Sequence, residues 1–378
     1  MSRLQKLIND LCPDGVEHKK IKQVYKRLKG TPITAEKMKE IDNPNGEIRI
    51  FAGGKTAINA MEKDIPNANI TRVPAVLVQS RGVIDAVYYD KPFTFKNEMW
   101  AYTADNTIAV KYLYYVLKSN ISHFRNAASG MGSLPQISLR DTEEFVIPLP
   151  PLPVQREIVR ILDNFTELTA ELTAELTAEL TARRKQYEYY RDLLLTFGDE
   201  VPRVKLGHIT TITRGVRVVK RQLSEIGTYP VFQNSVTPLG YYEKNNYPKN
   251  TVFVIGAGAA GEIGYSKVDF WAADDCFCLT CSDILQSRFL YYALLCQKDY
   301  LLSRVRRASV PRLARSVIEE LIIPVPPLKE QERIVAILDH FDALCNDLTS
   351  GIPAEIEARQ KQYEYYRDKL LTFKEVSA

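Results

Sequence analysis

The sequence Lys-Gln-Tyr-Glu-Tyr-Tyr-Arg-Asp occurs twice in this chain, at residues 185–192 and 361–368, which are 176 positions apart. The same offset relates Gln155 to Gln331 and the proline-rich segments 147–152 (IPLPPL) and 323–328 (IPVPPL). Shorter matches, such as Ser133-Leu134-Pro135 with Ser309-Val310-Pro311, keep this register. Solenoid repeats recur every ~20 to 50 residues, so a period this long indicates a duplicated domain with an attached helix. The 378 residues also exceed one ordinary hydrophobic core, which favours two domains.

Each copy consists of two parts with different patterns. The first part carries short β-type runs, such as Ala75–Gln79 and Thr251–Ile255, broken by Gly, Pro and Asn, which is typical of a mixed α/β globule. The second part begins with prolines and continues as a helical pattern. The predicted fold class is therefore α+β, with two mixed α/β globules alternating with two long helices. The predicted segments are 1–147 (a globule with a short N-terminal helix), 148–198 (a helical spacer that contains the tandem repeat 166–180), 199–323 (the second globule) and 324–378 (the second helical spacer).

The helical patterns cover about residues 154–197 and 330–373, with apolar residues three and four positions apart. A helix of about 44 residues would be about 66 Å long, and no globule of this size can bury its apolar stripe over that length. We therefore expect the two helices to pair as an antiparallel coiled coil, which gives the chain internal pseudo-twofold symmetry. The residues predicted to pack in the coiled coil are Ile158, Ile161, Leu162, Phe165, Leu168, Leu172, Leu176, Leu180, Ile334, Ile337, Leu338, Phe341 and Leu344.

A tandem Thr-Ala-Glu-Leu repeat fills residues 169–180 of the first helix, preceded by the degenerate Thr166-Glu167-Leu168. Ala, Glu and Leu are strong helix formers, so the repeat should continue the helix without a break. The corresponding stretch of the second helix contains Ser350-Gly351-Ile352-Pro353, which should kink or interrupt it.

Positive charge gathers in the globules, whereas the spacer repeat is acidic. Segments 203–222 and 298–315 are strongly basic and segment 19–39 is similarly biased, although the whole chain has a net charge of only +4. This layout suits two DNA-facing globules held apart by a strut that does not itself grip phosphates. A single basic cluster fits a solvated surface equally well, but recurrence in both halves favours DNA. The residues predicted to lie near DNA are Lys26, Arg27, Lys29, Lys55, Arg81, Arg125, Arg214, Arg217, Lys220, Arg221, Arg304, Arg306 and Arg307.

The order of globule, proline cluster and long helix, present twice, resembles the specificity subunit of type I restriction-modification enzymes over essentially the whole chain. The most specific features are Pro150-Pro151-Leu152 with Gln155, Pro326-Pro327-Leu328 with Gln331, and the two octapeptides. The tandem Thr-Ala-Glu-Leu repeat is similar to the spacer repeats of one subgroup of these subunits.

The resemblance implies a non-catalytic, sequence-specific DNA recognition subunit with two target-recognition domains. Each domain would read one half of a bipartite target in double-stranded DNA, and the helices would hold the two halves at a fixed separation. The helices would also dock two methyltransferase subunits, through which restriction subunits join the complex. No cofactor is expected in this chain, because S-adenosylmethionine and ATP would be bound by the partner subunits. The two recognition domains differ so much in sequence that no base-contacting residue can be transferred.

Residues Gly256–Gly261 match the dinucleotide fingerprint GxGxxG directly after the predicted strand Thr251–Ile255. That fingerprint must open a helix, whereas the following segment contains Gly264 and has the pattern of a second strand, so a glycine hairpin is predicted. Gly53–Thr56 lacks the first glycine of a phosphate-binding loop, because Arg49 stands in its place. Two alternatives stay open: a nucleotide-binding enzyme that uses the 256–261 glycine run, and a purely structural coiled-coil scaffold.

The sequence predicts no catalytic set and no metal site. Cys276, Cys278 and Cys281 lack a second ligand pair at zinc spacing, and the four histidines are far apart. No apolar run approaches the ~18 residues of a membrane helix, and the chain's start lacks the hydrophobic stretch of a signal peptide. Six cysteines without a framework spacing fit a reducing compartment, so we expect a cytoplasmic protein.

Overall fold

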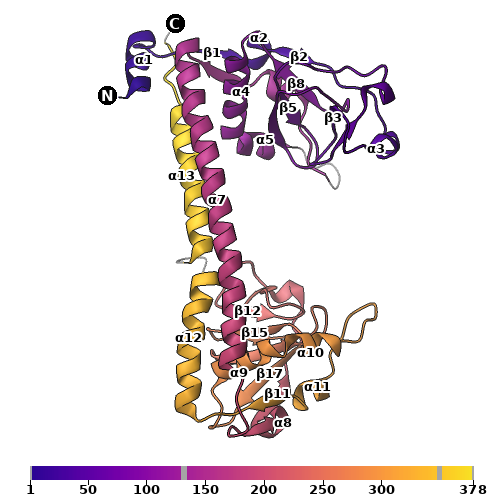
Figure 1. Ribbon diagram of the computed structural model, residues 1–378, viewed down its shortest axis with the longest axis vertical. Coiled ribbons are helices and arrows are strands. Elements are labelled where there is room, and N and C mark those ends of the chain that lie inside the picture. Colours follow the sequence, from indigo (N-terminus) through magenta and orange to yellow (C-terminus); the bar gives the residue numbers. More distant parts are fainter. Residues whose placement is uncertain (1, 129–133, 347–350, 377–378) are drawn as a thin grey trace. The chain divides into compact units, whose positions relative to one another are not determined.

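The computed structural model describes residues 2–128, 134–346 and 351–376. It contains two compact units (Figure 1): unit 1 comprises Met1–Ala174 and Ile356–Ala378, and unit 2 comprises Glu175–Glu355. Each unit combines one predicted globule with parts of the long helices. The longest helix, α7 (Leu152–Leu194), contributes its first part to unit 1 and the remainder to unit 2. The predicted α+β class, with globules alternating with long helices, is confirmed.

The two globules have the same strand topology although their sequences differ. Each has a four-stranded antiparallel sheet, ordered β2-β8-β5-β6 in unit 1 and β11-β17-β14-β15 in unit 2. Each also has a three-stranded sheet, β4-β3-β7 and β13-β12-β16, whose central strand is antiparallel to one neighbour and parallel to the other. The strands of unit 1 are β2 (Lys26–Leu28), β3 (Ile48–Phe51), β4 (Ala57–Ala60), β5 (Ala75–Gln79), β6 (Asp85–Tyr89), β7 (Phe93–Phe95) and β8 (Trp100–Thr103). Those of unit 2 are β11 (Thr210–Arg214), β12 (Tyr229–Phe232), β13 (Gly240–Tyr242), β14 (Thr251–Ile255), β15 (Ile263–Ser266), β16 (Trp271–Ala272) and β17 (Cys276–Cys281).

A two-stranded antiparallel ladder joins each globule to its proline-rich segment. β1 (Glu17–Lys20) pairs with β9 (Val146–Leu149), and β10 (Arg203–Lys205) pairs with β18 (Ile322–Pro324). The short helices of unit 1 are α1 (Arg3–Leu11), α2 (Ile21–Val24), α3 (Ala35–Ile41), η1 (Glu62–Asp64), α4 (Thr107–Ser119), α5 (Ile121–Ala127) and α6 (Leu139–Glu143). Those of unit 2 are α8 (Leu206–Ile209), η2 (Lys220–Gln222), α9 (Ser287–Cys296), α10 (Lys298–Ser303) and α11 (Arg315–Glu319).

One apolar helix packs on the four-stranded sheet of each globule. α4 contacts β5 and β6, and α9 contacts β14 and β15. Leu113 and Val116 of α4 are buried, as are Phe289 and Leu290 of α9. Because α4 and α9 also face the long helices, they connect each sheet to the helical part of its unit.

The repeated glutamines Gln155 and Gln331 hold the proline-rich segments against the long helices. The Nε2 of Gln155 donates to the carbonyl oxygen of Pro150 at 2.7 Å, and the Nε2 of Gln331 donates to that of Pro326 at 2.8 Å. Both glutamine side chains are buried. A buried carbonyl without a hydrogen bond is costly, so these contacts fix how the chain enters each long helix.

A tyrosine, a base and a carboxylate join α4 to the long helix α7 in unit 1. Tyr115 donates its hydroxyl hydrogen to Asp163 Oδ1 at 2.6 Å, and Lys111 Nζ lies 2.8 Å from Asp163 Oδ2. Burial, together with the hydrogen bond to Asp163, raises the pKa of Tyr115, so this hydroxyl stays a donor at neutral pH.

The same arrangement recurs in unit 2 with a stronger base. Tyr292 of α9 donates to Asp339 Oδ1 at 2.5 Å, and Arg288 Nε lies 2.6 Å from the same oxygen. Arg288 also reaches Asp342 at 3.0 Å, and its guanidinium lies 4.7 Å from the ring centre of Tyr265. Only 8% of Arg288 is exposed, whereas the Lys111 side chain is 32% exposed, so the cation is more buried than its counterpart in unit 1.

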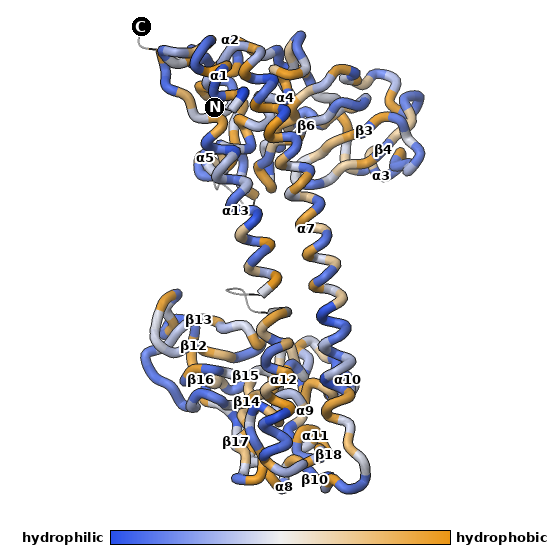
Figure 2. Tube along the Cα trace, turned by 60° about the vertical axis from the view of Figure 1, so that its left-hand side comes forward, coloured by the Kyte–Doolittle hydropathy of each residue, from blue (hydrophilic) through white to orange (hydrophobic). Residues whose placement is uncertain are grey.

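The long helices pair in antiparallel fashion within each unit. In unit 1, α7 lies beside α13 (Ile352–Leu370), where the ring centres of Phe165 and Tyr366 are 6.2 Å apart (Figure 1). In unit 2, Tyr190 of α7 stacks on Phe341 of α12 (Leu328–Asn346) at 5.9 Å. Hydrophobic and hydrophilic residues alternate along α7, as expected for a helix that packs on one face (Figure 2).

Four predicted coiled-coil residues, Ile158, Leu162, Ile334 and Leu338, lie fully buried in core clusters that also contain residues of α4 and α9. The same clusters include Leu371, directly after α13, and Tyr187 of α7, so packing between the long helices at these four positions stays a prediction. Leu168 is 59% exposed and lines, with Leu172 and Tyr363, a pocket between α7 and α13. The remaining predicted residues are half-buried or, for Phe165, partly exposed on the paired helices: Ile161, Phe165, Leu172, Leu176, Leu180, Ile337, Phe341 and Leu344.

The second long helix is in two pieces, as the sequence predicts. α12 ends at Asn346 and α13 begins at Ile352 with Pro353 in its first turn, where the missing N–H of proline does no harm. Ser350 lies outside the described residues, as does Ser133 of the earlier repeat match.

Each octapeptide packs on the globule of the other half of the chain. At the end of α7, Asp192 accepts a hydrogen bond from Cys296 at 3.2 Å, and Tyr187 and Leu195 enter the core of unit 2. At the end of α13, Asp368 accepts from Ser119 at 2.6 Å. Each globule is therefore completed by a helix end that belongs to the other repeat.

Candidate nucleic-acid interface

Three loops meet at one edge of the globule in unit 1. The backbone N–H of Gly54, after β3, donates to the carbonyl oxygen of Arg81, after β5, at 3.0 Å. The N–H of Gly82 donates to Pro135 O at 2.9 Å, and Arg81 forms a β-bridge with Gln136. We call this meeting point of residues 53–55, 81–82 and 134–136 the turn edge of unit 1.

The corresponding loops also meet in unit 2, where the loop after β14 donates and the loop after β12 accepts. The N–H of Ala259, after β14, donates to Asn234 O, after β12, at 2.9 Å. The N–H of Gly258 donates to Pro311 O at 3.2 Å, and Ala257 forms a β-bridge with Arg312. Residues 234, 257–259 and 306–312 are the turn edge of unit 2. Gly82 and Gly258, and likewise Pro135 and Pro311, are 176 positions apart, so the two edges are equivalent.

Both turn edges depend on a glycine in the left-handed conformation. The φ angles of Gly82 and Gly258 are +78° and +87°, values that residues with a side chain rarely adopt. A Cβ atom on Gly258 would also lie 2.8 Å from the carbonyl oxygen of Asn234. The predicted glycine hairpin at 256–261 is confirmed, because β14 and β15 on either side of it are antiparallel. No helix follows these glycines, so the dinucleotide fingerprint fails.

The thirteen residues predicted to lie near DNA are all exposed, and eleven of them fall into two regions of each globule. One region is the turn edge, which carries Lys55 and Arg81 in unit 1 and Arg306 and Arg307 in unit 2. The other region is the edge strand of the four-stranded sheet and the segment after it. It carries Lys26, Arg27 and Lys29 in unit 1, and Arg214, Arg217, Lys220 and Arg221 in unit 2. Arg125 lies near the turn edge of unit 1, where its Nε donates to Ile84 O at 3.1 Å, and Arg304 lies at the end of α10.

Several of these cations already have partners inside the protein. Arg27 pairs with Glu143 at 3.3 Å, Arg214 donates to the carbonyl oxygen of Asp274, and the guanidinium of Arg304 lies 4.9 Å from the ring centre of Tyr300. These residues are less available to an outside anion than the sequence pattern suggested, because each has a fixed partner.

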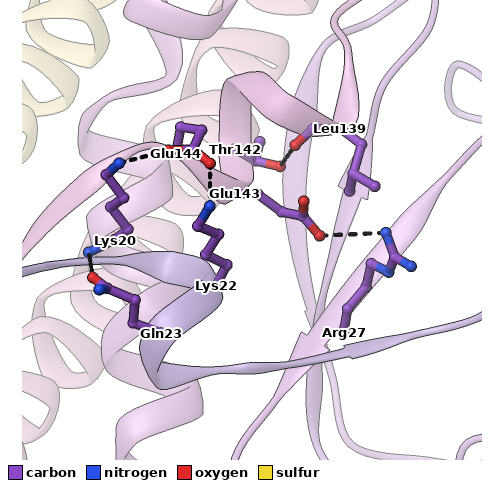
Figure 3. A network of polar contacts seen from close by, with 8 residues as sticks. All are labelled: Lys20, Lys22, Gln23, Arg27, Leu139, Thr142, Glu143 and Glu144. Atoms are coloured by element: carbon purple, nitrogen blue, oxygen red, sulfur yellow. Dashed lines mark hydrogen bonds and ion pairs between the residues drawn. The ribbon is translucent and has the colours of Figure 1, made fainter.

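The base-rich segment at the start of unit 1 is neutralised in part by α6 and the residue after it (Figure 3). Lys20 and Lys22 both reach the carboxylate of Glu144, with Lys20 Nζ 2.7 Å from it. The neighbouring Glu143 forms an ion pair with Arg27. These pairs join residues more than 100 positions apart, which no local sequence pattern reveals.

Replacing Glu144 by Gln should weaken the acid dependence of stability. The hydrogen bonds from Lys20 and Lys22 lower the pKa of Glu144 from 4.5 to about 2. A carboxyl group with a lowered pKa stabilises the fold above its usual pKa, and this contribution disappears as the pH falls toward 2. The difference between the urea midpoints of the parent and Glu144→Gln should therefore shrink as the pH falls from about 4.5 to about 2. The control is Glu36→Gln on α3, and an equal difference at both ends of this range would contradict the assignment.

Sequence reasoning missed Arg312. It stands opposite Ala257 across a β-bridge and opposite Arg306 across another, so it lies in the middle of the turn edge of unit 2. Arg312 directly follows Pro311, the last residue of the repeated Ser-Val-Pro match, and this position could have drawn attention to it. Nothing in the sequence showed that this segment lies beside Ala257.

Within residues 2–128, 134–346 and 351–376, no group of His, Cys, Asp and Glu side chains could hold a metal ion. Burial raises the pKa of the Cys276 thiol to about 12, which fits a small apolar core residue. In the same described ranges, no helix is long and apolar enough to cross a membrane.

The fold and its two equivalent edges define a duplicated α+β protein with a basic surface on each copy. The chain matches the family described as type I restriction modification DNA specificity domain, over residues 13–182 and again over residues 199–358. It therefore belongs to this family.

Curated relatives carry corresponding names. The EcoR124I/EcoR124II specificity subunit of Escherichia coli is 35% identical over 298 residues, which cover 71% of this chain and 72% of the relative. The MpnII specificity subunit of Mycoplasma pneumoniae is 31% identical over 306 residues, covering 64% of this chain and 92% of the relative. A further match, 36% identical, spans 61% of this chain and 64% of a Haemophilus influenzae chain named as a type I restriction enzyme specificity subunit.

Solved structures share the fold. An S subunit of a type I restriction-modification system from M. genitalium has a TM-score of 0.53 and 20% identity, covering 94% of this chain and 96% of that one. A chain from a study of complex assembly and conformational transition of the type I system has a TM-score of 0.64 and 17% identity, covering 95% and 98%.

Proposed function

We propose that this chain is the DNA recognition subunit of a type I restriction-modification complex and that each unit reads one half of a bipartite target. The observation that carries the proposal is the recurrence of one exposed, basic turn edge in two globules of dissimilar sequence. Phosphate contacts place a protein on the duplex, but only base edges or DNA shape separate a target from bulk DNA. An edge with both cations and closely approaching glycine backbone can supply both kinds of contact.

The proposed partners are two copies of a methyltransferase subunit, with restriction subunits joining through the assembled complex. The octapeptides support two identical docking sites, because their exposed residues are repeated as faithfully as their buried ones. Tyr189 is 64% exposed and Tyr365 is 61% exposed, and each contacts its neighbouring tyrosine ring with the same geometry, at 5.4 Å. Packing inside the chain does not require an exposed tyrosine at both places.

S-adenosylmethionine and ATP would be bound by the partners, and this chain would be a non-catalytic, cytoplasmic protein without a cofactor.

Binding to DNA should depend steeply on salt, and the cations after β11 should contribute. A chain in which Arg217, Lys220 and Arg221 are all replaced by Ala should bind a random-sequence duplex more weakly, and its logarithmic salt slope should fall by about two to three. The measurement is a fluorescence titration of a labelled duplex with the full chain at two salt concentrations. The control is Arg315→Ala, because Arg315 is paired with Glu319 at 2.7 Å, and its slope should stay that of the parent.

The same titration separates the two alternatives. A coiled-coil scaffold would show no affinity for DNA at either salt concentration. A nucleotide-binding enzyme would bind NAD tightly, which a parallel titration with NAD tests. Adding the methyltransferase subunit should saturate at two copies per chain, and saturation at one copy would contradict the twofold docking.

A further inference from the structure

Both turn edges present an arginine at the same position, although the two arginines come from opposite sides of the β-bridge. In unit 1 the bridge joins Arg81 to Gln136, and in unit 2 the equivalent bridge joins Ala257 to Arg312. Positions 81 and 257 correspond in the repeat, as do 136 and 312. Residues directly opposite each other in an antiparallel bridge share one face, so the guanidinium stands over the same face in both units.

These two guanidinium groups have no partner within the described part of the chain. Neither Arg81 nor Arg312 makes a hydrogen bond, ion pair or aromatic contact through its side chain to another described residue, and both are exposed. The contrast with Arg27 and Arg315, which have fixed carboxylate partners, shows that exposure alone does not explain this. The repeated fold fixes the backbone of an arginine at this bridge, and no described residue occupies the side-chain donors of that arginine.

An exposed aliphatic side chain accompanies each arginine. Leu134 is 49% exposed and Val310 is 47% exposed, and both precede the proline whose carbonyl oxygen accepts from the turn glycine. A surface that contacts only phosphates does not need an aliphatic side chain at this place. The major groove offers an apolar contact for such a side chain, because the thymine methyl group lies among the hydrogen-bonding edges of the bases.

At the turn edge of unit 1, Gly54 leaves empty the space that a side chain would fill. Gly54, Gly82 and Gly258 all have positive φ, and the space where a Cβ of Gly54 would stand is open. In unit 1 the backbone can therefore approach a duplex closely, which brings Arg81 within reach of base edges instead of the phosphates alone. Arg312 stands at the equivalent bridge of unit 2.

We propose that Arg81 and Arg312 are specificity-determining residues, each of which reads a guanine through paired hydrogen bonds to its O6 and N7 atoms. Arginine is suited to this task because its planar fork donates two parallel hydrogen bonds. The inference rests on the proposed function, and it adds which residue in each unit reads a base and which base it reads. Arg81 serves the half-site bound by unit 1, and Arg312 serves the half-site bound by unit 2.

The test is selection of targets from a library of randomised duplexes by the full-length chain and by its Arg81→Lys and Arg312→Lys variants. Lysine keeps the positive charge but loses the fork, so a phosphate contact largely survives this change whereas paired recognition of guanine does not. Arg81→Lys should lower the preference for guanine at one position of one half-site by about 10- to 100-fold. Arg312→Lys should do the same in the other half-site and leave the first unchanged.

Matched controls are Arg72→Lys in unit 1 and Arg315→Lys in unit 2, whose guanidinium groups are paired with Glu62 and Glu319. Both controls should select the parent's target. Unaltered guanine preference at every position in Arg81→Lys and Arg312→Lys would overturn the inference and leave DNA recognition standing. A parent chain that selects no sequence at all would instead overturn the proposed function. Circular dichroism of each variant shows that its fold is intact, because both arginines are exposed and their backbone bridges do not involve the side chain.

Discussion

A chain that lacks Thr173–Leu176 should select DNA targets whose two conserved halves lie one or two base pairs closer together. Four residues of α-helix are about 6 Å long, and B-DNA rises about 34 Å in ten base pairs. The deleted unit is one copy of the tandem repeat within α7, so its neighbours can close the gap as an uninterrupted helix. The measurement is sequencing of duplexes selected from a randomised library by the parent and by the deleted chain.

The place of this deletion makes the expected effect specific. The division between the two compact units falls between Ala174 and Glu175, inside the repeat. The contacts of α7 with α13 at Phe165 and with α12 at Tyr190 lie outside the deleted residues, and the next Thr-Ala-Glu-Leu copy supplies the same residue types at the vacated positions. A chain with one extra Thr-Ala-Glu-Leu unit tests the opposite change, and it should select targets with a longer gap between the two conserved halves. The Leu176→Met chain, with unchanged length, should select the parent's gap. If deletion and insertion both left the gap unchanged, the helix could not be a spacer.

Replacing Arg288 by Leu should destabilise unit 2 by about 2 kcal/mol, because it removes the buried cation that Asp339 and Asp342 share. The loss is smaller than for a fully buried pair, because the Asp339 side chain is 45% exposed and can be hydrated. The change also leaves the Tyr292 hydroxyl without one of its two polar contacts. Urea unfolding of the full chain, combined with hydrogen exchange of peptides from α9 and α12, measures the effect.

Lys111→Met in unit 1 is the matched control. Lys111 and Asp163 are both about one-third exposed, so their pair contributes less, about 1 kcal/mol or below. Hydrogen exchange should therefore accelerate much more in unit 2 of Arg288→Leu than in unit 1 of Lys111→Met. Equal effects in the two units would show that the burial of the arginine does not govern the strength of this contact.

The internal repeat predicted that each half has the same order of globule, proline-rich segment and long helix, because matched motifs recur at one offset of 176 residues. The pattern around Gly264 also predicted the hairpin after β14, since two strands joined by glycines leave no helix for a dinucleotide. The bounds of the long helices were predicted to within a few residues, because Pro and Gly mark their ends.

What the sequence could not predict were contacts between distant segments. Ile158 and Leu162 have the spacing of a helix–helix seam, but the same apolar stripe fits the core of a globule equally well. Both residues lie in one core cluster with residues of α4. The charge of Arg27 was visible, whereas its neutralisation by Glu143 depends on the fold. Arg312 was overlooked because its importance depends on which strand it faces. Periodicity indicates which side chains share a face of a helix or strand, but it does not indicate which other element that face packs against.

The exchange of helix ends between the repeats has a consequence for how such a chain can change. The same eight residues complete both globules, through Asp192 at Cys296 and Asp368 at Ser119. A new globule that packs against one copy of this segment can therefore also pack against the other copy, because the eight residues are identical. Recombination could replace either globule without any adjustment of the helices, so new combinations of half-sites would arise from whole-module substitution and not from gradual refitting.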